Sequence, residues 1–277
     1  MLEEPAAWQR YTMLEQVVRA NKEIKGWYRY LPLSYLLLPS RMPPRHGFPT
    51  ALTKGLLHRQ IRFELRRGLR VECRFEEVHA FFEVFALGVY QVPLDWAAMT
   101  NIIDVGANVG AATLWFASMA PKAAIISVEP SQQTEGRLAN NVRLNGLSDR
   151  VNLENKAMAP ESGTIYFNES TTSGNSFTTA DKGETAVAVE AISLPDLITK
   201  YGLSHIDLLK LDCEGAEYAL LENLPSSLFS IIRNVVGEYH PNTAANIGDL
   251  ERIFRKEGYE FASKEMWSGT GLFFARR

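Results

Sequence analysis

The chain has few cysteines and no long run of apolar residues. Its two cysteines, Cys73 and Cys213, lie 140 residues apart and belong to no CxxC pair, so neither a disulfide framework nor a zinc finger is expected. The longest apolar stretch, residues 30–39, contains two prolines and is far shorter than the roughly 20 residues of a membrane-spanning helix. The first residues, MLEEPAAWQR, are acidic where a signal peptide is basic. We therefore expect a cytoplasmic protein in a reducing compartment, with no membrane span.

The composition excludes a disordered chain and a fibrous repeat, because 46% of the residues are hydrophobic and 22% are charged. Charge is spread unevenly. Nine basic groups stand against two acidic ones in residues 41–74 (Arg41, Arg45, Lys54, Arg59, Arg62, Arg66, Arg67, Arg70 and Arg74). This basic patch is interpreted first as a solvated face, and alternatively as a site for a phosphate-bearing or otherwise anionic substrate or carrier. The whole chain is acidic, with net charge −3, so a nucleic-acid partner is not expected.

The N-terminal part differs in pattern from the rest. Residues 8–24 have apolar side chains near helical spacing and predict an amphipathic helix. Residues 26–50 contain five prolines and predict an irregular, ordered arm. Residues 61–90 predict short strands followed by a helix-compatible run, FFEVFALGVY. We expect residues 1–80 to form an N-terminal extension with a role in acceptor or dimer contacts, and residues 81–277 to form the main domain.

From Asn101 onward, short apolar strands alternate with helix-length segments, which is typical of a parallel α/β sheet. The five principal strands are expected over Ile102 to Val105, Ala124 to Val128, Val151 to Asn155, Ile206 to Leu211 and Ile232 to Gly237. Extra strands are expected over Thr164 to Phe167 and Ala186 to Val189, and two closing strands over Tyr259 to Phe261 and Gly271 to Ala275.

A glycine-containing turn follows the first of these strands. The segment DVGANVG, Asp104 to Gly110, leads directly into a helix-compatible run. Glycines at such a turn let a ligand approach the backbone, and the helix N-terminus presents free N–H groups. The next strand ends in Glu129, 25 residues after Asp104, where an acidic side chain can accept both hydroxyls of a ribose. A nucleoside site is therefore expected.

The dinucleotide fingerprint GxGxxG is absent, because the next glycine after Gly106 is Gly110. Asp104 also puts an anion beside the place that a pyrophosphate would occupy. A nucleoside with a cationic amino group and no phosphates suits this loop better, and S-adenosylmethionine has both features. Asp104 is then expected to face its ammonium group, and Glu129 to hold its ribose.

A second polar cluster follows the fourth and fifth strands. LLKLDCEGAEYALLE carries Lys210 and Asp212, then Glu214 and Glu217 around Gly215, and VVGEYHP carries Glu238 and His240. Because ligands bind at the carboxyl ends of parallel strands, these side chains are expected around one crevice beside the nucleoside. The alternative is a structural ion-pair network around Lys210.

Taken together, IIDVGANVG, ISVEPSQQTEGRLANNVRLNG, LLKLDCEGAEYALLE and VVGEYHP resemble the FkbM-type S-adenosylmethionine-dependent methyltransferases from about Glu83 to the C-terminus. The resemblance implies a class I methyltransferase fold, in which a seven-stranded, mostly parallel sheet with one antiparallel strand has helices on both faces. It also implies O-methylation of a sugar or another small metabolite. The residues that match the family's motifs fall into three groups. The cofactor loop contains Asp104, Gly106, Ala107, Asn108 and Gly110, and the ribose site contains Glu129 and Pro130. The segments after the fourth and fifth strands contain Lys210, Asp212, Glu214, Gly215, Glu217, Glu238 and His240.

The expected mechanism requires a base for the acceptor hydroxyl. His240 is the candidate, because the ordinary pKa of histidine suits neutral pH, with Asp212, Glu214 or Glu238 orienting it or the acceptor. A divalent cation held by Asp212, Glu238 and His240 is the less favoured variant. Tyr90 is a candidate cofactor contact, with core packing as the alternative.

Two other functions remain as alternatives, an NAD-linked oxidoreductase and a non-catalytic module that binds an anionic partner through residues 41–74. A homo-oligomer is a further expectation.

Overall fold

The structure is a computed structural model of the chain. It describes residues 2, 4, 5, 8, 19, 22, 23, 58–65, 67–168, 177, 178, 186–240, 245–267 and 269–277. The arm expected over residues 26–50 lies outside these residues, and so does nearly all of the helix expected over residues 8–24.

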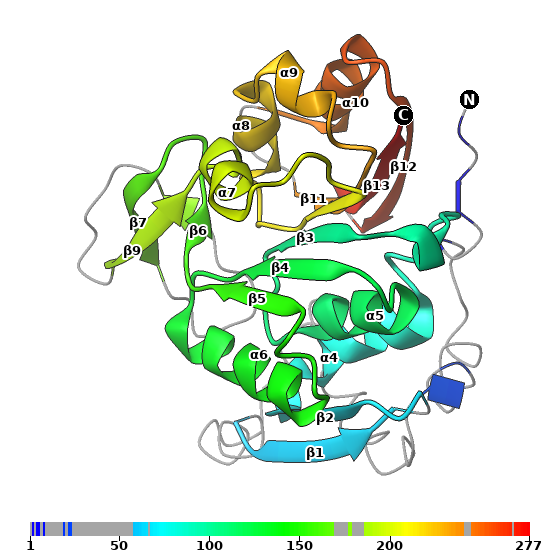
Figure 1. Cartoon of the computed structure of the whole chain (residues 1–277), viewed down its shortest axis with the longest axis vertical. Coiled ribbons are helices and arrows are strands. Elements are labelled where there is room, and N and C mark those ends of the chain that lie inside the picture. Colours follow the sequence, from blue (N-terminus) through cyan, green and yellow to red (C-terminus); the bar gives the residue numbers. More distant parts are fainter. Residues whose placement is uncertain are drawn as a thin grey trace, which may run out of the picture.

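A seven-stranded sheet forms the centre of the fold (Figure 1). Its strands are β3 (Asn101–Val105), β4 (Ala124–Val128), β5 (Val151–Glu154), β10 (Leu208–Leu211), β11 (Asn234–Tyr239), β12 (Glu260–Trp267) and β13 (Thr270–Arg276). They lie in the order β12-β13-β11-β10-β3-β4-β5. The five strands from β11 to β5 are parallel, and β13 is antiparallel to both of its neighbours. This confirms the class I methyltransferase fold, with its single antiparallel strand.

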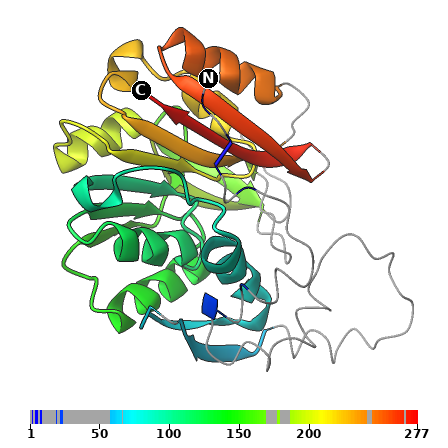
Figure 2. The same ribbon diagram turned by 90° about the vertical axis from the view of Figure 1, so that its right-hand side faces the viewer.

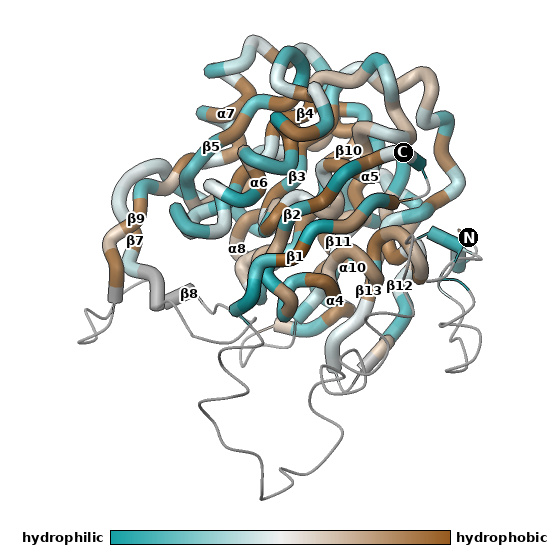
Figure 3. The backbone as a smooth tube through the Cα atoms, turned by 90° about the horizontal axis from the view of Figure 1, so that it is seen from below, coloured by the Kyte–Doolittle hydropathy of each residue, from teal (hydrophilic) through white to brown (hydrophobic). Residues whose placement is uncertain are grey.

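Helices cover both faces of this sheet (Figure 1). One face carries α4 (Val78–Phe81), α5 (Ala111–Met119) and α6 (Gln132–Leu144). The other carries α7 (Leu194–Tyr201), α8 (Glu217–Glu222), α9 (Ser226–Phe229) and α10 (Ile247–Lys256). The core accordingly divides into two hydrophobic clusters, one containing Phe116 and the other Phe254. The apolar segments in Figure 3 run through the middle of the molecule, as expected for strands covered on both faces.

A smaller sheet follows β5, in the order β6-β9-β7-β8. Its strands are β6 (Ala157–Met158), β7 (Gly163–Asn168), β8 (Phe177–Thr178) and β9 (Ala186–Ile192). β7 and β9 contain the two extra strands expected from the sequence, so that prediction is confirmed.

The described part of the N-terminal region packs against the main domain (Figure 2). A hairpin of β1 (Gln60–Glu64) and β2 (Arg70–Arg74) lies against α6, and its Phe63 and Val71 belong to the same hydrophobic cluster as α5. The chain continues through η3 (Phe75–Glu77), α4, the π-helical turn η4 (Phe82–Leu87) and η5 (Trp96–Ala98). The division of the chain at residue 80 stays a prediction.

Several arginines of the basic patch have acidic partners. Arg62 pairs with Glu72 at 2.8 Å, and Arg74 lies 3.6 Å from Glu76. Arg67 lies 3.6 Å from Glu23. These pairs favour the solvated-face interpretation; Arg41, Arg45, Lys54 and Arg66 lie outside the described residues. Among the described residues, no helix combines the length and apolar character needed to cross a bilayer.

Candidate active site

Four adjacent parallel strands end at one edge of the sheet. β4, β3, β10 and β11 are neighbours, so the residues that follow them share the carboxyl edge, where open α/β sheets bind ligands. The edge carries the glycine turn after β3, Glu129 after β4 and Asp212 after β10. Glu238 and His240 lie at the end of β11. The polar residues expected around one crevice are therefore brought to the same edge.

The glycine turn after β3 cannot accommodate larger residues at two positions. Gly106 has φ +73°, and a Cβ on it would lie 1.8 Å from the carbonyl oxygen of Asp212. Gly110 has φ +92°, and its Cβ would lie 2.7 Å from Leu138 Cδ1. Between them, Asn108 also has a positive φ of 50°. The turn is thus in close contact with the end of β10, so the expected nucleoside site lies next to the polar residues that follow β10.

Glu129 holds this turn with its side chain. Its Oε2 accepts the backbone N–H of Asn108 and its Oε1 accepts that of Ser131, both at 2.9 Å. Burial raises the pKa of Glu129 to about 7, although the two N–H donors partly offset that effect. Each carboxylate oxygen keeps a lone pair for a further donor, so the side chain can still accept ribose hydroxyls.

The neighbouring backbone is also fixed by hydrogen bonds. The N–H of Ala107 donates to the carbonyl of Val128 at 3.0 Å. Asn155 Nδ2 donates to the carbonyls of Glu129 and Pro130 at 2.9 and 3.2 Å. Ala107 and Pro130 therefore lie beside the candidate ribose site, as expected.

The side chain of Asp104 does not have the orientation expected for a contact with the ammonium group of the ligand. This side chain is fully buried, with Oδ2 accepting the Thr113 hydroxyl at 2.6 Å and Oδ1 lying 3.1 Å from Lys210 Nζ. The carboxylate therefore faces the interior rather than a ligand's ammonium group. The reason is Lys210, whose buried charge requires an anionic partner.

Lys210 is the centre of a buried polar group. Its Nζ donates to the carbonyls of Val105 and Gly106 at 3.1 and 2.8 Å, and it lies 3.5 Å from Asp212 Oδ2. Burial lowers the pKa of the ammonium group, but Asp104 and Asp212 outweigh that effect and raise it. Lys210 is thus held protonated beneath the glycine turn. The interpretation of a structural ion-pair network fits Lys210 and Asp104.

Tyr90 reaches the same group from the segment after η4. Its hydroxyl donates to Asp212 Oδ2 at 2.8 Å, and its ring lies 5.4 Å from Lys210 Nζ. Burial raises the pKa of the phenol, so it stays a donor to Asp212. Tyr90 also belongs to the buried core, which agrees with the core-packing alternative, and its contact with a cofactor stays a prediction.

Acidic side chains surround His240. Its Nδ1 lies 3.4 Å from Glu217 Oε1, and its Nε2 lies 3.5 Å from Glu214 Oε2 and 4.0 Å from Glu238 Oε1. Burial of the ring lowers the pKa of His240. Contact with Glu217 and the charges of Asp212 and Glu238 outweigh that effect and raise the pKa to about 9. The ordinary pKa of histidine predicts a mostly neutral ring at neutral pH, whereas the ring here is held mostly protonated.

Glu238 lacks a close cationic partner among the described residues other than His240. Burial, followed by the charges of Asp212 and Glu83, raises its pKa well above the ordinary range. Glu83 comes from the π-helical turn η4 and lies 3.3 Å from His79. Burial raises the pKa of Glu83 as well, so the site gathers more carboxyl groups than its cations keep ionised.

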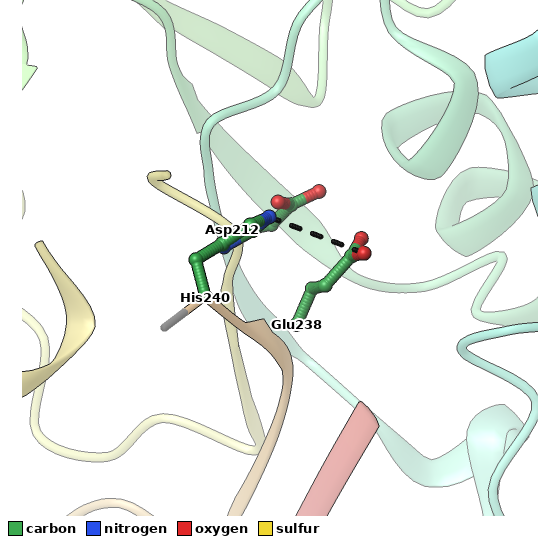
Figure 4. A group of neighbouring side chains, drawn as sticks. All are labelled: Asp212, Glu238 and His240. Carbon is green, nitrogen blue, oxygen red and sulfur yellow. Dashed lines mark ion pairs between the residues drawn. The ribbon is translucent and has the colours of Figure 1, made fainter. Parts of the chain in front are cut away.

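Three of these groups could hold a cation. Oxygen and nitrogen atoms of Asp212, Glu238 and His240 lie within 4.8 Å of one another (Figure 4). Two carboxylates and an imidazole are acceptable ligands for a divalent metal. Both ring nitrogens of His240 already face carboxylates, however, and the proton that they hold competes with a metal.

Two acidic residues of the site were not assigned a role from the sequence. Glu83 does not follow any of the expected strands. It lies in an apolar, helix-compatible run, and nothing in that run indicates which charged residues it approaches. Glu217 belongs to the acidic cluster expected after the fourth strand, but its contact with His240 joins residues that are 23 positions apart. Only the tertiary packing of η4 and α8 brings these side chains to the others.

The comparisons with known proteins define the class. Residues 104–261, more than half of the chain, match the model of the methyltransferase FkbM domain. The chain therefore belongs to the FkbM methyltransferase family, which confirms the resemblance inferred from its motifs.

Curated relatives include two proteins named as methyltransferases and one named as a synthetase. The chain is 30% identical over 168 residues to methyltransferase sdnD of Sordaria araneosa, covering 50% of this chain and 65% of that protein. It is 28% identical over 133 residues to 2-O-methyltransferase NoeI of Sinorhizobium fredii, covering 42% and 54%. The AMB antimetabolite synthetase AmbE of Pseudomonas aeruginosa is 27% identical over 242 residues, covering 69% of this chain and 11% of AmbE. The chain thus spans less than two thirds of these relatives' own lengths.

Solved structures share only a distant likeness. M. capricolum TrmK in complex with S-adenosyl-homocysteine has a TM-score of 0.41 and 11% identity, covering 65% of this chain and 62% of that one. A methyltransferase from Agrobacterium tumefaciens has a TM-score of 0.45 and 11% identity, covering 85% and 72%.

Proposed function

We propose that this methyltransferase transfers a methyl group from S-adenosylmethionine to a hydroxyl group of a sugar or another small metabolite. The observation that carries the proposal is the junction of the glycine turn with β10. Gly106 is in contact with the carbonyl of Asp212, so a nucleoside on the turn lies beside the groups that follow β10 and β11. The family membership supports the transfer of a methyl group.

The donor half of the site uses the turn and Glu129. In this proposal, Glu129 accepts the ribose hydroxyls, and the glycines of the turn leave room for the methionine portion. Asp104 acts indirectly, because it fixes Lys210, which holds the carbonyls of the turn. When bound, S-adenosylmethionine supplies the methyl group and a positive sulfonium charge.

The acceptor half uses His240 and its carboxylates. The acceptor oxygen must lie in line with the bond from sulfur to methyl, and its proton must leave. His240 is the proposed base, with Asp212 or Glu238 orienting the acceptor hydroxyl. A positive charge close to an imidazole disfavours its protonated form and lowers its pKa. Donor binding therefore favours the neutral imidazole, which can accept the proton.

Two observations support oxygen as the atom that is methylated. A base beside the donor is what a neutral hydroxyl needs, and the name of one relative is 2-O-methyltransferase NoeI. An acceptor with an anionic group next to its hydroxyl fits poorly with the carboxylates of the site. The acceptor is therefore proposed to be uncharged at this position.

Two experiments test the proposal. Calorimetry with S-adenosylmethionine, its demethylated product and NADH should detect binding of the first two only. A labelled-methyl assay should then be run against hydroxylated sugars, nucleotide sugars and polyketide-type metabolites, and the His240→Ala variant should lose turnover on the acceptor found. Tight binding of NADH without binding of the sulfonium compound would favour the oxidoreductase alternative and overturn the proposal.

A further inference from the structure

Glu217 is a fully buried carboxylate at the start of α8, and its side chain is 0% exposed. Its Oε1 accepts the backbone N–H of Cys213 at 2.8 Å and lies 3.4 Å from Nδ1 of His240. A buried carboxylate is costly unless polar partners surround it. Among the described residues, its partners are the backbone N–H and the thiol of Cys213 and the imidazole of His240.

The two nitrogens of His240 have different surroundings. Nδ1 faces Glu217, which is buried, whereas Nε2 faces Glu214 and Glu238, whose side chains are 40% and 21% exposed. Asp212 lies close to Glu238 and His240, with one ligand atom of each within 4.8 Å of the others (Figure 4). Glu217 therefore contacts the ring from the protein interior, and the other carboxylates contact it from the carboxyl edge.

The same oxygen of Glu217 also fixes the backbone next to the site. Cys213, whose N–H it accepts, stands between Asp212 and Glu214. Glu214 has a φ of 55° and Gly215 a φ of 99°, so this turn adopts a conformation that needs support. One carboxylate thus sets the position of the turn and of the imidazole together.

We propose that Glu217 is a positioning residue that keeps the proton of His240 on Nδ1 and turns Nε2 toward the acceptor. This inference rests on the proposed function for its chemical consequence. In the reaction, Nε2 takes the proton of the acceptor hydroxyl while the bond from oxygen to methyl forms and the bond from sulfur to methyl breaks. Glu217 stabilises the resulting imidazolium from the Nδ1 side, and the proton then passes from Nε2 to water.

The first test needs only the wild-type protein. Nitrogen-15 NMR of the histidine side chains, with His240 assigned through the His240→Gln variant, reports which ring nitrogen carries the proton. We expect the neutral ring above pH 9 to be the Nδ1–H tautomer. A predominant Nε2–H tautomer overturns the inference.

The second test compares Glu217→Gln with Glu214→Gln, which makes the same change on the Nε2 side. Glu217→Gln should remove the Nδ1–H preference and lower the titration midpoint of His240 by at least one pH unit. Glu214→Gln should keep the tautomer. Glu217→Asp, which retains the charge, should restore part of the preference and serves as the second variant if Glu217→Gln does not fold. Wild-type tautomer and midpoint in folded Glu217→Gln would show that Glu217 only supports the Cys213 turn.

Kinetics then separate this inference from the proposed function. With an acceptor in hand, Glu217→Gln should lower kcat at least tenfold and leave the affinity for S-adenosylmethionine unchanged. If the wild-type protein binds no S-adenosylmethionine but the tautomer is as expected, the proposed function fails and the positioning of His240 stands. If the donor binds and kcat is unchanged in Glu217→Gln, the positioning role fails alone.

Discussion

The Cα atom of Gly106 lies so close to Asp212 that a Cβ would stand 1.8 Å from the Asp212 carbonyl oxygen. This contact joins the turn after β3 to the end of β10, and the carbonyl of Gly106 also accepts a hydrogen bond from Lys210 at 2.8 Å. The donor half and the acceptor half of the site therefore meet at this contact, and a substitution that disrupts the contact itself should affect both.

The first prediction concerns this contact. Gly106→Ala should destabilise the protein by about 3 kcal/mol and abolish donor binding, because the methyl group meets backbone and the φ of +73° is unfavourable for alanine. Gly136→Ala is the matched control, since Gly136 lies in α6 with no atom within 4 Å of its Cβ position. The control should be neutral or stabilised by up to about 1 kcal/mol. Thermal denaturation and calorimetry measure both effects, and equal behaviour of the two variants would contradict the prediction.

The second prediction follows from Glu129. Its pKa of about 7 means that the carboxylate loses its charge as the pH falls through 7, and a protonated group accepts ribose hydroxyls less well. The affinity for S-adenosyl-homocysteine, whose sulfur is neutral, should rise between pH 6 and pH 8. Glu129→Gln should bind about tenfold more weakly and show no such rise. Calorimetry at the two pH values tests this, and a flat wild-type profile would count against the role of Glu129.

The raised pKa of Glu129 also makes the free energy of unfolding depend on pH. The folded-state pKa is raised above that of the unfolded chain, so between about pH 4.5 and 7 the folded state binds more protons. The contribution of Glu129 to the free energy of unfolding must then decrease as the pH rises through this window. Glu129 thus destabilises the free protein at neutral pH, which is consistent with a group kept for binding.

The third prediction uses the charge difference between donor and product. His240 has a pKa of about 9 in the free protein, so it is mostly protonated at pH 8. Binding of the sulfonium compound should lower that pKa and release up to about one proton, whereas the neutral S-adenosyl-homocysteine should release fewer. Calorimetry in two buffers of different ionisation enthalpy measures the difference. His240→Gln should remove it, and equal proton release by both ligands in the wild type would refute the electrostatic argument.

The sequence was sufficient for the strands and for the residues at their carboxyl ends, because apolar runs bounded by glycine and acidic residues are local signals. β4 was predicted with its observed bounds, and Glu129 and Asp212 lie where their strands end. The contacts of Asp104 could not be predicted in this way. Its partner Lys210 is 106 positions away, and only the pairing of β3 with β10 brings the two together.

The protonation of His240 could not be predicted from the sequence either, because it also depends on contacts between residues far apart in the chain. The ordinary pKa of histidine is a property of an isolated side chain, whereas the value here results from carboxylates that follow β10 or lie on α8 and β11. Glu83 on η4 acts on Glu238 in the same manner. Electrostatic effects of this kind depend on distances between elements, which local periodicity does not contain.

The fourth prediction concerns metal ions. If a proton rather than a metal occupies the group formed by Asp212, Glu238 and His240, dialysis against EDTA should leave methyl transfer unchanged, and added magnesium should not raise it. The reason is that His240 already faces carboxylates through both nitrogens. Loss of activity in EDTA that magnesium restores would instead establish the divalent-cation variant.

The last prediction concerns Lys210, whose ammonium group balances Asp104 and Asp212 in the interior. Lys210→Met should destabilise the protein by about 3–5 kcal/mol, because it leaves buried carboxylates without their cation. Asp104→Asn should cost less, since an amide can still contact Thr113 and needs no counter-charge. In the double variant the two costs should not add, because removing Asp104's charge relieves part of the loss caused by Lys210→Met. Urea denaturation of the four proteins gives this coupling directly, and simple additivity would mean that the 3.1 Å contact between the two side chains contributes nothing to stability.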